Sequence, residues 1–148
     1  GEMYHSQKLY DLLFGSFNKR FSNQRTDFDW LSRDQKEVDA YIQDPLCGFP
    51  FTAAAYLDLI SLQYYSNTKL WYKTLPQNLP MLLISGSMDP VGGYGKGISA
   101  IAKNLHNVGI QDLTVWLYPE ARHELLNELN RDEVMRDVLS WLALHSAE

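Results

Sequence analysis

The segment Met81–Pro90, MLLISGSMDP, decides the fold of this chain. Its first four residues are apolar at consecutive positions, and the run stops at Gly86. Consecutive rather than alternating apolar residues are typical of a strand that is covered on both faces of a parallel sheet. The segment therefore predicts a buried strand, followed by a loop that presents Asp89 just past the end of the strand. Pro90 favours the loop, because proline resists helical continuation.

A second strand is predicted about one helix later, over residues 113–118. It contains the strand formers Val115 and Trp116, and it stops at Pro119. The loop that follows carries His123. In open α/β sheets, functional groups collect in the loops at the carboxyl ends of strands, and both predicted loops lie at such ends.

Helical patterns alternate with the two strands. A helix from about Lys96 is ended by Gly109, and its core-facing residues are predicted to be Ile98, Ile101, Ala102 and Leu105. A last helix follows a possible capping box at Asn130 and Glu133, and its buried side is predicted to contain Val134, Val138, Trp141 and Leu142. This strand–helix–strand–helix order predicts an α/β fold with a parallel sheet flanked by helices.

The first half of the chain predicts helices and a polar loop at 18–29, without a strand. Its predicted helices are residues 7–14, a helix opened by a capping box of Ser32 and Gln35 and ended by Pro45, a helix over about 53–65 capped by Thr52, and a weaker piece at 70–72. Two strands alone do not make a stable parallel sheet. We therefore expect a helical cap over residues 1–78, followed by the C-terminal portion of an α/β core over residues 79–148. An unpaired strand edge also invites a second copy of the chain, so a homo-oligomer is expected.

Composition indicates the cellular compartment that we expect and argues against some classes of partner. The chain has 148 residues, 45% of them hydrophobic, and a formal net charge of -5, which argues against nucleic acid as a partner. Its single cysteine, Cys47, cannot form an internal disulfide, and we expect a cytoplasmic protein. No run reaches the roughly 20 apolar residues of a transmembrane segment. The chain opens at Gly1 with neither an initiator methionine nor a signal peptide, so a fragment of a longer protein is expected.

An acid and a histidine in neighbouring loops are two parts of a hydrolytic triad. The carboxylate accepts a hydrogen bond from one imidazole nitrogen, which fixes the tautomer, and the other nitrogen takes a proton from the nucleophile. The chain order of Asp89 before His123, with a serine further upstream, is the order found in α/β-hydrolases.

The sequence resembles the lysophospholipase and monoacylglycerol lipase-like branch of the α/β-hydrolases, which is related to serine aminopeptidases. The segments that carry the resemblance are 82–93 around the Asp-Pro pair, 118–128 around Arg-His-Glu, and the cap-like stretches 28–34 and 44–49. The resemblance implies that Asp89 is the triad acid, that His123 is the triad base, and that no cofactor or metal is needed.

One departure from the family pattern concerns the nucleophile. The sequence contains no Gly-x-Ser-x-Gly, and the nearest string, Gly97–Ile101, lacks the second glycine and lies in a predicted helix. We expect the serine and the oxyanion hole to lie on an N-terminal half outside this chain. The 148-residue chain alone is therefore expected to be inactive.

Simpler interpretations stand beside these assignments. His123 alone would be an exposed loop histidine, and an aspartate before proline commonly forms a turn. Asp112 and Glu120 are fallback acids. Glu124 and Glu128 are predicted to anchor the loop or the following helix, and Arg122 is predicted to be a solvated or paired charge. Cys47 is interpreted as a small buried residue rather than a nucleophile. The glycine-rich stretch 92–97 lacks the spacing of a phosphate loop, and no His/Cys/Asp cluster has metal-ligand spacing.

The function expected from these features is hydrolysis of carboxylic esters, on small lipid-like monoacyl substrates, by a serine esterase or lipase. Aromatic residues of the predicted cap would line an acyl-chain pocket or pack the cap onto the core. Two alternatives stay open: a non-catalytic binding module with the hydrolase shape, and an α/β-hydrolase of other chemistry, such as a peptidase or dehalogenase.

Overall fold

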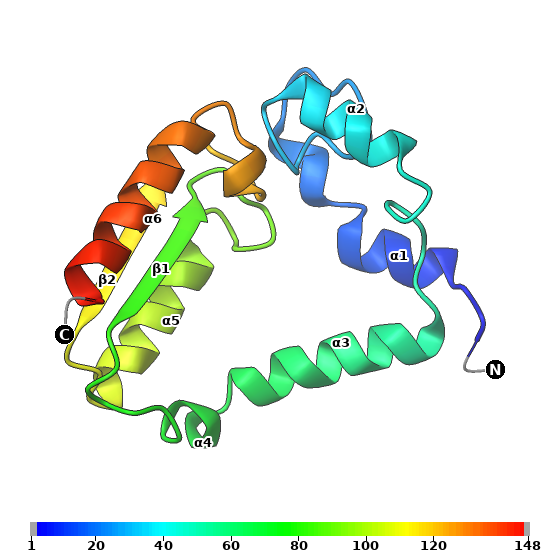
Figure 1. Cartoon of the computed structure of the whole chain (residues 1–148). Helices are drawn as coiled ribbons and strands as arrows, with labels where there is room; N and C mark the ends of the chain where they lie inside the picture. The colour runs from blue at the N-terminus through cyan, green and yellow to red at the C-terminus, as the bar shows by residue number, and fades with distance from the viewer. Residues whose placement is uncertain (1–2, 147–148) are drawn as a thin grey trace.

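A computed structural model describes residues 3–146, and its second half forms a compact β-α-β-α unit (Figure 1). The order is β1 (Met81–Gly86), α5 (Lys96–Asn107), β2 (Leu113–Tyr118) and α6 (Arg131–His145), with a short 3₁₀ helix, η2 (Leu125–Asn127), before α6. The two strands are parallel, with Met81 opposite Leu113 and Gly86 opposite Tyr118. Both predicted strands and the parallel pairing are confirmed.

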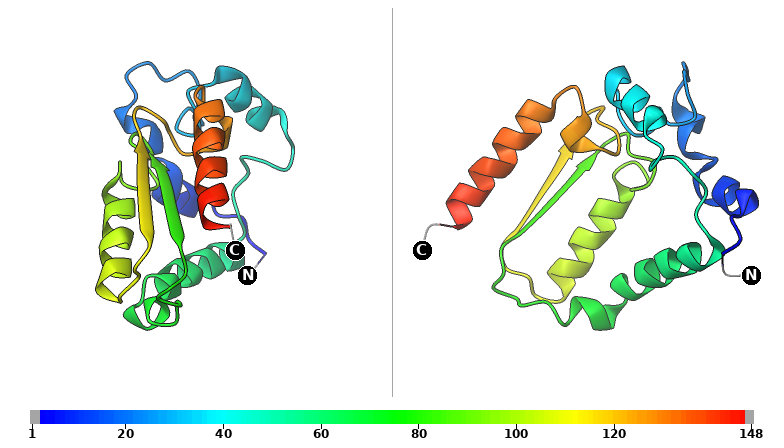
Figure 2. Two further views of the ribbon diagram at one scale, coloured as in Figure 1. Left: turned by 60° about the vertical axis from the view of Figure 1, so that its left-hand side comes forward. Right: turned by 45° about the vertical axis from the view of Figure 1, so that its right-hand side comes forward.

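The two faces of this sheet are covered by different helices, α5 on one side and α6 on the other (Figure 2). On the α6 side, Ile84 and Trp116 pack against a buried cluster that includes Val134. On the α5 side, Leu83 packs against a second cluster that includes Leu105. Cover on both faces explains why the first strand is apolar at consecutive positions.

The first half is a helical region, defined here as residues 3–78. It contains α1 (Gln7–Phe14), the 3₁₀ helix η1 (Phe17–Arg20), α2 (Gln35–Gln43), α3 (Ala53–Ser66) and α4 (Lys69–Tyr72). Helix α3 leads from the part of the chain near α1 to the foot of the β-α-β-α unit, and α2 lies near the loops at its other end (Figure 1). The predicted helices are thus present, and η1 occupies part of the predicted polar loop.

Helix capping agrees with the prediction at one position and differs at two. Thr52 caps α3 as predicted by accepting from the Ala55 amide, and Ser6, for which no cap is predicted, accepts from the Leu9 amide. The prediction that Ser32 caps the next helix is wrong, because Asp34 does so by accepting from the Lys36 amide.

The second difference is at the start of α6, where the predicted capping box is absent. Asn130 is the N-cap residue, but its side chain makes no capping hydrogen bond, and its side-chain amide donates instead to the Glu133 carboxylate over 2.9 Å. The amide group of asparagine can donate as well as accept. The two residues of the predicted capping box are therefore in contact, but through their side chains and with Asn130 as the donor.

Two residues predicted to face the core are exposed. Ile101 on α5 is 36% exposed and Leu142 on α6 is 47% exposed. Among residues 3–146 each strand has one hydrogen-bonded neighbour, so the outer parts of both helices extend beyond the sheet. A groove of about 540 Å³ follows the β1 edge, and Ile101 lies in its wall.

The helical region also has exposed apolar side chains. Leu57, Leu62 and Tyr64 of α3 are each at least 65% exposed. Within residues 3–146, no helix has the length and apolar character needed to cross a membrane.

Candidate active site

Asp89 is held in the turn that follows β1. Its amide donates to the Gly86 carbonyl, its carbonyl accepts from the Tyr94 amide over 2.8 Å, and Oδ1 accepts from the Val91 amide over 2.9 Å. Gly92 passes so close that a Cβ atom there would lie 3.0 Å from Asp89 Oδ2. The carboxylate is therefore fixed by backbone contacts, and the residue is only 7% exposed.

The loop after β2 is bonded to the turn that carries Asp89. The Met88 amide donates to the Ala121 carbonyl over 2.9 Å, and the Ser87 hydroxyl accepts from the Glu120 amide over 2.8 Å. Gly86 makes this approach possible, because a Cβ atom there would lie 2.2 Å from the carbonyl oxygens of the facing loop. The glycine that ends β1 thus brings the two predicted functional loops together.

The structure brings Asp89 and His123 into direct contact. His123 Nδ1 lies 3.1 Å from Asp89 Oδ1. The His123 side chain is 38% exposed, whereas that of Asp89 is 10% exposed. A buried carboxylate on Nδ1 selects the tautomer with the proton on Nδ1, which leaves Nε2 free to accept a proton. The arrangement can therefore serve a general base.

The two fallback acids lie elsewhere. The side chain of Glu120 is 86% exposed, and its nearest cation is Arg33 at 3.9 Å. Asp112 pairs instead with His145, whose Nε2 lies 3.1 Å from Asp112 Oδ2. Among residues 3–146, the carboxylate that contacts the His123 ring is that of Asp89.

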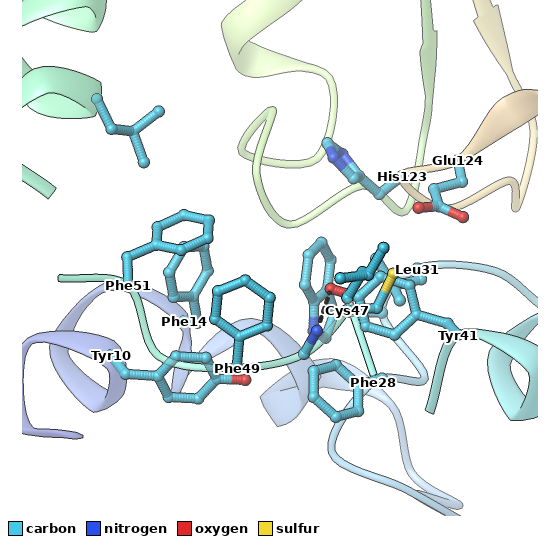
Figure 3. A pocket seen from close by; sticks show the side chains of 14 residues that line it. Tyr10, Phe14, Phe28, Leu31, Tyr41, Cys47, Phe49, Phe51, His123 and Glu124 are labelled. Atoms are coloured by element: carbon cyan, nitrogen blue, oxygen red, sulfur yellow. Dashed lines mark hydrogen bonds between the residues drawn. The ribbon is translucent and has the colours of Figure 1, made fainter. Parts of the chain in front are cut away.

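A largely apolar cavity of about 350 Å³ lies next to His123. It lies between the β-α-β-α unit and part of the helical region, and His123 lies across it from Phe14, Phe49 and Phe51 (Figure 3). The Trp30 ring contacts the His123 ring, with 5.3 Å between the ring centroids. Aromatic residues of the helical region and the histidine therefore share one cavity.

Trp30 is a contact of His123 that local sequence patterns do not reveal. The Trp30 carbonyl accepts from the His123 amide over 3.4 Å, and the Leu31 carbonyl accepts from the Glu124 amide over 2.8 Å. The only signal was its place in the cap-like stretch 28–34, since a helix or strand period does not show which loop a residue meets.

Cys47 also lines the cavity. Partial burial, with the nearby carboxylates of Asp44 and Glu124, raises the pKa of the Cys47 thiol. The thiolate is the nucleophilic form, so these surroundings keep Cys47 in its unreactive form at neutral pH.

Ser99, the serine of the Gly97–Ile101 string, lies in the first turn of α5. Its hydroxyl donates to the Gly95 carbonyl over 2.9 Å. A nucleophile elbow needs a sharp turn from a strand into a helix, and Ser99 is not placed in one. Within residues 3–146, no group of three His, Cys, Asp or Glu side chains is arranged to hold a metal ion.

Comparison with known proteins places the chain in a family. Residues 3–130, well over half of the chain, match the family described as serine aminopeptidase, S33. The chain belongs to this family. Its resemblance to the serine aminopeptidase-related α/β-hydrolases, proposed above from loop motifs, is therefore confirmed.

A curated relative is a lipase. The monoacylglycerol lipase of Mycolicibacterium smegmatis (strain ATCC 700084 / mc(2)155) is 28% identical over 126 residues. The alignment covers 82% of this chain and 41% of the relative. The chain thus spans less than half the length of that relative.

Solved structures show the same fold. A highly thermostable carboxyl esterase from Bacillus coagulans, in complex with glycerol, matches with a TM-score of 0.88 and 26% identity over 96% of this chain and 46% of its own. A lipase in its open form matches with a TM-score of 0.86 and 26% identity over 99% and 48%. A monoacylglycerol lipase from Paleococcus ferrophilus shares the fold, with a TM-score of 0.61 and 19% identity over 98% and 55%. The predicted α/β-hydrolase fold is confirmed, and this chain corresponds to about half of each solved relative.

Proposed function

We propose that the intact protein is a serine hydrolase that cleaves carboxylic esters of lipid-like monoacyl compounds. In this proposal Asp89 and His123 are two members of its catalytic triad. The observation that carries the proposal is the 3.1 Å contact between His123 Nδ1 and Asp89 Oδ1, beside an apolar cavity. A carboxylate-held histidine that also borders a substrate-sized cavity is suited to proton transfer during acyl chemistry.

The reaction would proceed in two stages. The serine hydroxyl attacks the ester carbonyl while Nε2 of His123 takes its proton, and Asp89 stabilises the imidazolium that forms. The imidazolium then protonates the leaving alcohol, which departs from an acyl-enzyme. Water, deprotonated by Nε2 in turn, attacks the acyl-enzyme, and the imidazolium returns that proton to the serine oxygen as the carboxylic acid leaves.

The nucleophile in this proposal lies outside the 148 residues. The sequence contains no Gly-x-Ser-x-Gly, and the chain covers 41% of its curated relative and 46–48% of the two solved relatives with 26% identity. We assign the serine and the oxyanion hole to the part of the fold that these relatives have and this chain lacks. Residues 1–78 then act as a cap, and residues 79–148 carry the acid and the base of the core.

The lining of the cavity supports the proposal of an acyl substrate. Its walls are mostly apolar, and they include aromatic side chains of residues 10–51 as well as His123 (Figure 3). An apolar cleft with few polar groups at one end suits an acyl chain whose carbonyl must reach the catalytic residues. The names of two relatives, a carboxyl esterase and a monoacylglycerol lipase, agree with an ester of this kind.

A fluorophosphonate probe applied to the intact protein tests the proposal. The probe should label one serine upstream of this chain, and mass spectrometry of the labelled peptide should locate it. Absence of any labelled serine in a folded protein would contradict the esterase proposal and favour a non-catalytic binding module. A panel of monoacylglycerols, lysophospholipids and aminoacyl amides would then rank the substrates, and turnover of amides alone would indicate a peptidase.

A further inference from the structure

A short segment of the helical region is bonded along the length of the His123 loop. Besides the carbonyls of Trp30 and Leu31, which accept from the amides of His123 and Glu124, Ser32 donates its hydroxyl to the Asn127 carbonyl over 2.7 Å. We call residues 29–33 the docking segment and residues 122–128 the histidine loop. Their contacts join residues that are at least 90 positions apart in sequence.

Arg122, the residue before His123, extends this docking. Its guanidinium donates to the Asp29 and Ser32 carbonyls and lies over the Phe21 ring, 4.2 Å from the ring centroid. The Arg122 side chain therefore points into the helical region rather than toward the cavity, and it leaves the cavity to His123.

Glu128 lies at the centre of the contact, and it is fully buried. One of its carboxylate oxygens, Oε1, accepts from the Arg122 amide over 2.8 Å and from the Arg33 amide over 3.1 Å. The other, Oε2, accepts from Arg33 Nε over 2.8 Å and from the Leu129 amide over 3.0 Å. A single oxygen thus joins the docking segment to the residue that precedes His123.

Burying a carboxylate is unfavourable unless it is paired and its oxygens are fully hydrogen-bonded. Glu128 meets that condition with a guanidinium and three backbone amides, and charge-assisted hydrogen bonds of this kind are short and strong. Two of the donors come from the docking segment and one comes from the histidine loop. Moving either segment would therefore break hydrogen bonds to the buried Glu128 carboxylate, so the two segments are held together.

We propose that Glu128 is a positioning residue, which holds the backbone of the histidine loop so that His123 keeps its contact with Asp89. The docking segment is the fixed support against which it does so. This inference rests on the proposed function, in which His123 is the base. Because residues 29–33 are bonded to the backbone of the histidine loop, the base is preorganised for its contact with Asp89.

The test is Glu128→Gln in the intact enzyme, with Glu133→Gln as the matched control on an exposed carboxylate of α6. The amide keeps the size of the side chain but turns one acceptor oxygen into a donor that faces two N–H groups. With a p-nitrophenyl ester, we expect kcat to fall about 10- to 100-fold with KM within about twofold of wild type, the loss expected for a misplaced catalytic group. Glu133→Gln should match wild type.

A spectroscopic measurement separates positioning from general stability. In ¹⁵N-histidine-labelled intact enzyme, the hydrogen-bonded Nδ1–H proton of His123 should give a downfield signal that Glu133→Gln preserves. In Glu128→Gln this signal should shift or disappear at a temperature where circular dichroism shows a folded protein. A folded Glu128→Gln enzyme with normal kcat and an unchanged signal would overturn the inference.

If Glu128→Gln does not fold, Arg33→Lys decides the matter. Lysine keeps the charge and the backbone amide but loses the Nε donor to Glu128. We expect a kcat loss of about tenfold, the effect of one charge-assisted hydrogen bond, and normal kcat would overturn the inference. His123→Ala, measured alongside, distinguishes the two proposals: retained turnover in that variant contradicts the proposed function itself, whereas its loss beside a fully active Glu128→Gln contradicts only the role of Glu128.

Discussion

His123 Nδ1 lies 3.1 Å from Asp89 Oδ1, although 34 residues separate the two in sequence. Both residues follow parallel neighbouring strands, so their loops emerge at the same edge of the sheet. The close approach of those loops at Gly86 then completes the contact.

Replacing Asp89 by Asn should leave the fold intact and reduce kcat for ester hydrolysis by roughly 10³- to 10⁴-fold, because an amide at this position no longer selects the Nδ1–H tautomer. Steady-state kinetics of the intact enzyme measure this. Asp112→Asn is the matched control, since Asp112 pairs with His145 away from the site. Equal losses in the two variants would rule out a specific role for Asp89.

The cavity should control chain-length preference. Phe49 lines the cavity and is 47% exposed, so Phe49→Ala should fold normally. KM for a long-chain monoacyl ester should rise about fivefold, the equivalent of about 1 kcal/mol of lost apolar contact. KM for p-nitrophenyl acetate should stay unchanged, as should both values in Leu144→Ala, which changes an exposed residue of α6. A uniform change across chain lengths would place the acyl chain elsewhere.

Gly86→Ala should destabilise the protein by at least about 3 kcal/mol, because its Cβ atom would overlap the carbonyl oxygens of Ala121 and Arg122. Gly93→Ala is a comparison in which the new Cβ atom has room but the backbone φ of +61° is unfavourable, which costs about 1 kcal/mol. Urea denaturation gives both values. Similar losses in the two variants would show that the loop contact at Gly86 is not tight.

Stability should fall in strongly alkaline solution through Tyr118. Burial, together with the 3.0 Å hydrogen bond from its hydroxyl to Asp137, raises the pKa of Tyr118 to about 12. Between the unfolded value near 10 and 12, the folded state holds a proton that the unfolded state has lost, so stability decreases as pH rises. Urea denaturation at pH 9 to 11.5 should show a steeper decrease for wild type than for Tyr118→Phe. Parallel decreases would contradict the assignment.

The strands and most helices follow from local sequence. Residues 81–84 are apolar at consecutive positions because helices cover both faces, and Thr52 caps its helix because its hydroxyl has a free amide three residues on. Local rules are less reliable where a distant partner also binds. The Ser32 hydroxyl donates to the Asn127 carbonyl, 95 positions away, and accepts from the Asp34 amide, while Asp34 takes the capping position.

In the candidate site, too, some residues can be predicted from local sequence and others depend on distant partners. Asp89 and His123 are recognisable from their places after two strands and from the resemblance of their loops to a known family. Glu128 was predicted only to anchor its loop, because its partner Arg33 lies 95 positions earlier and a local pattern cannot specify such a pair. Leu142 and Ile101 were predicted to be buried from helical periodicity, which does not show how far the sheet beside them extends.

Hydrolysis of a p-nitrophenyl ester by the intact enzyme, with and without His123→Ala, tests whether His123 is the catalytic base. We expect a loss in kcat of roughly 10⁴- to 10⁶-fold in a variant whose circular dichroism and melting curve match wild type. His106→Ala, on the surface of α5, should keep full activity. Turnover by His123→Ala within tenfold of wild type would contradict the assignment of His123 as the base and of Asp89 as its partner.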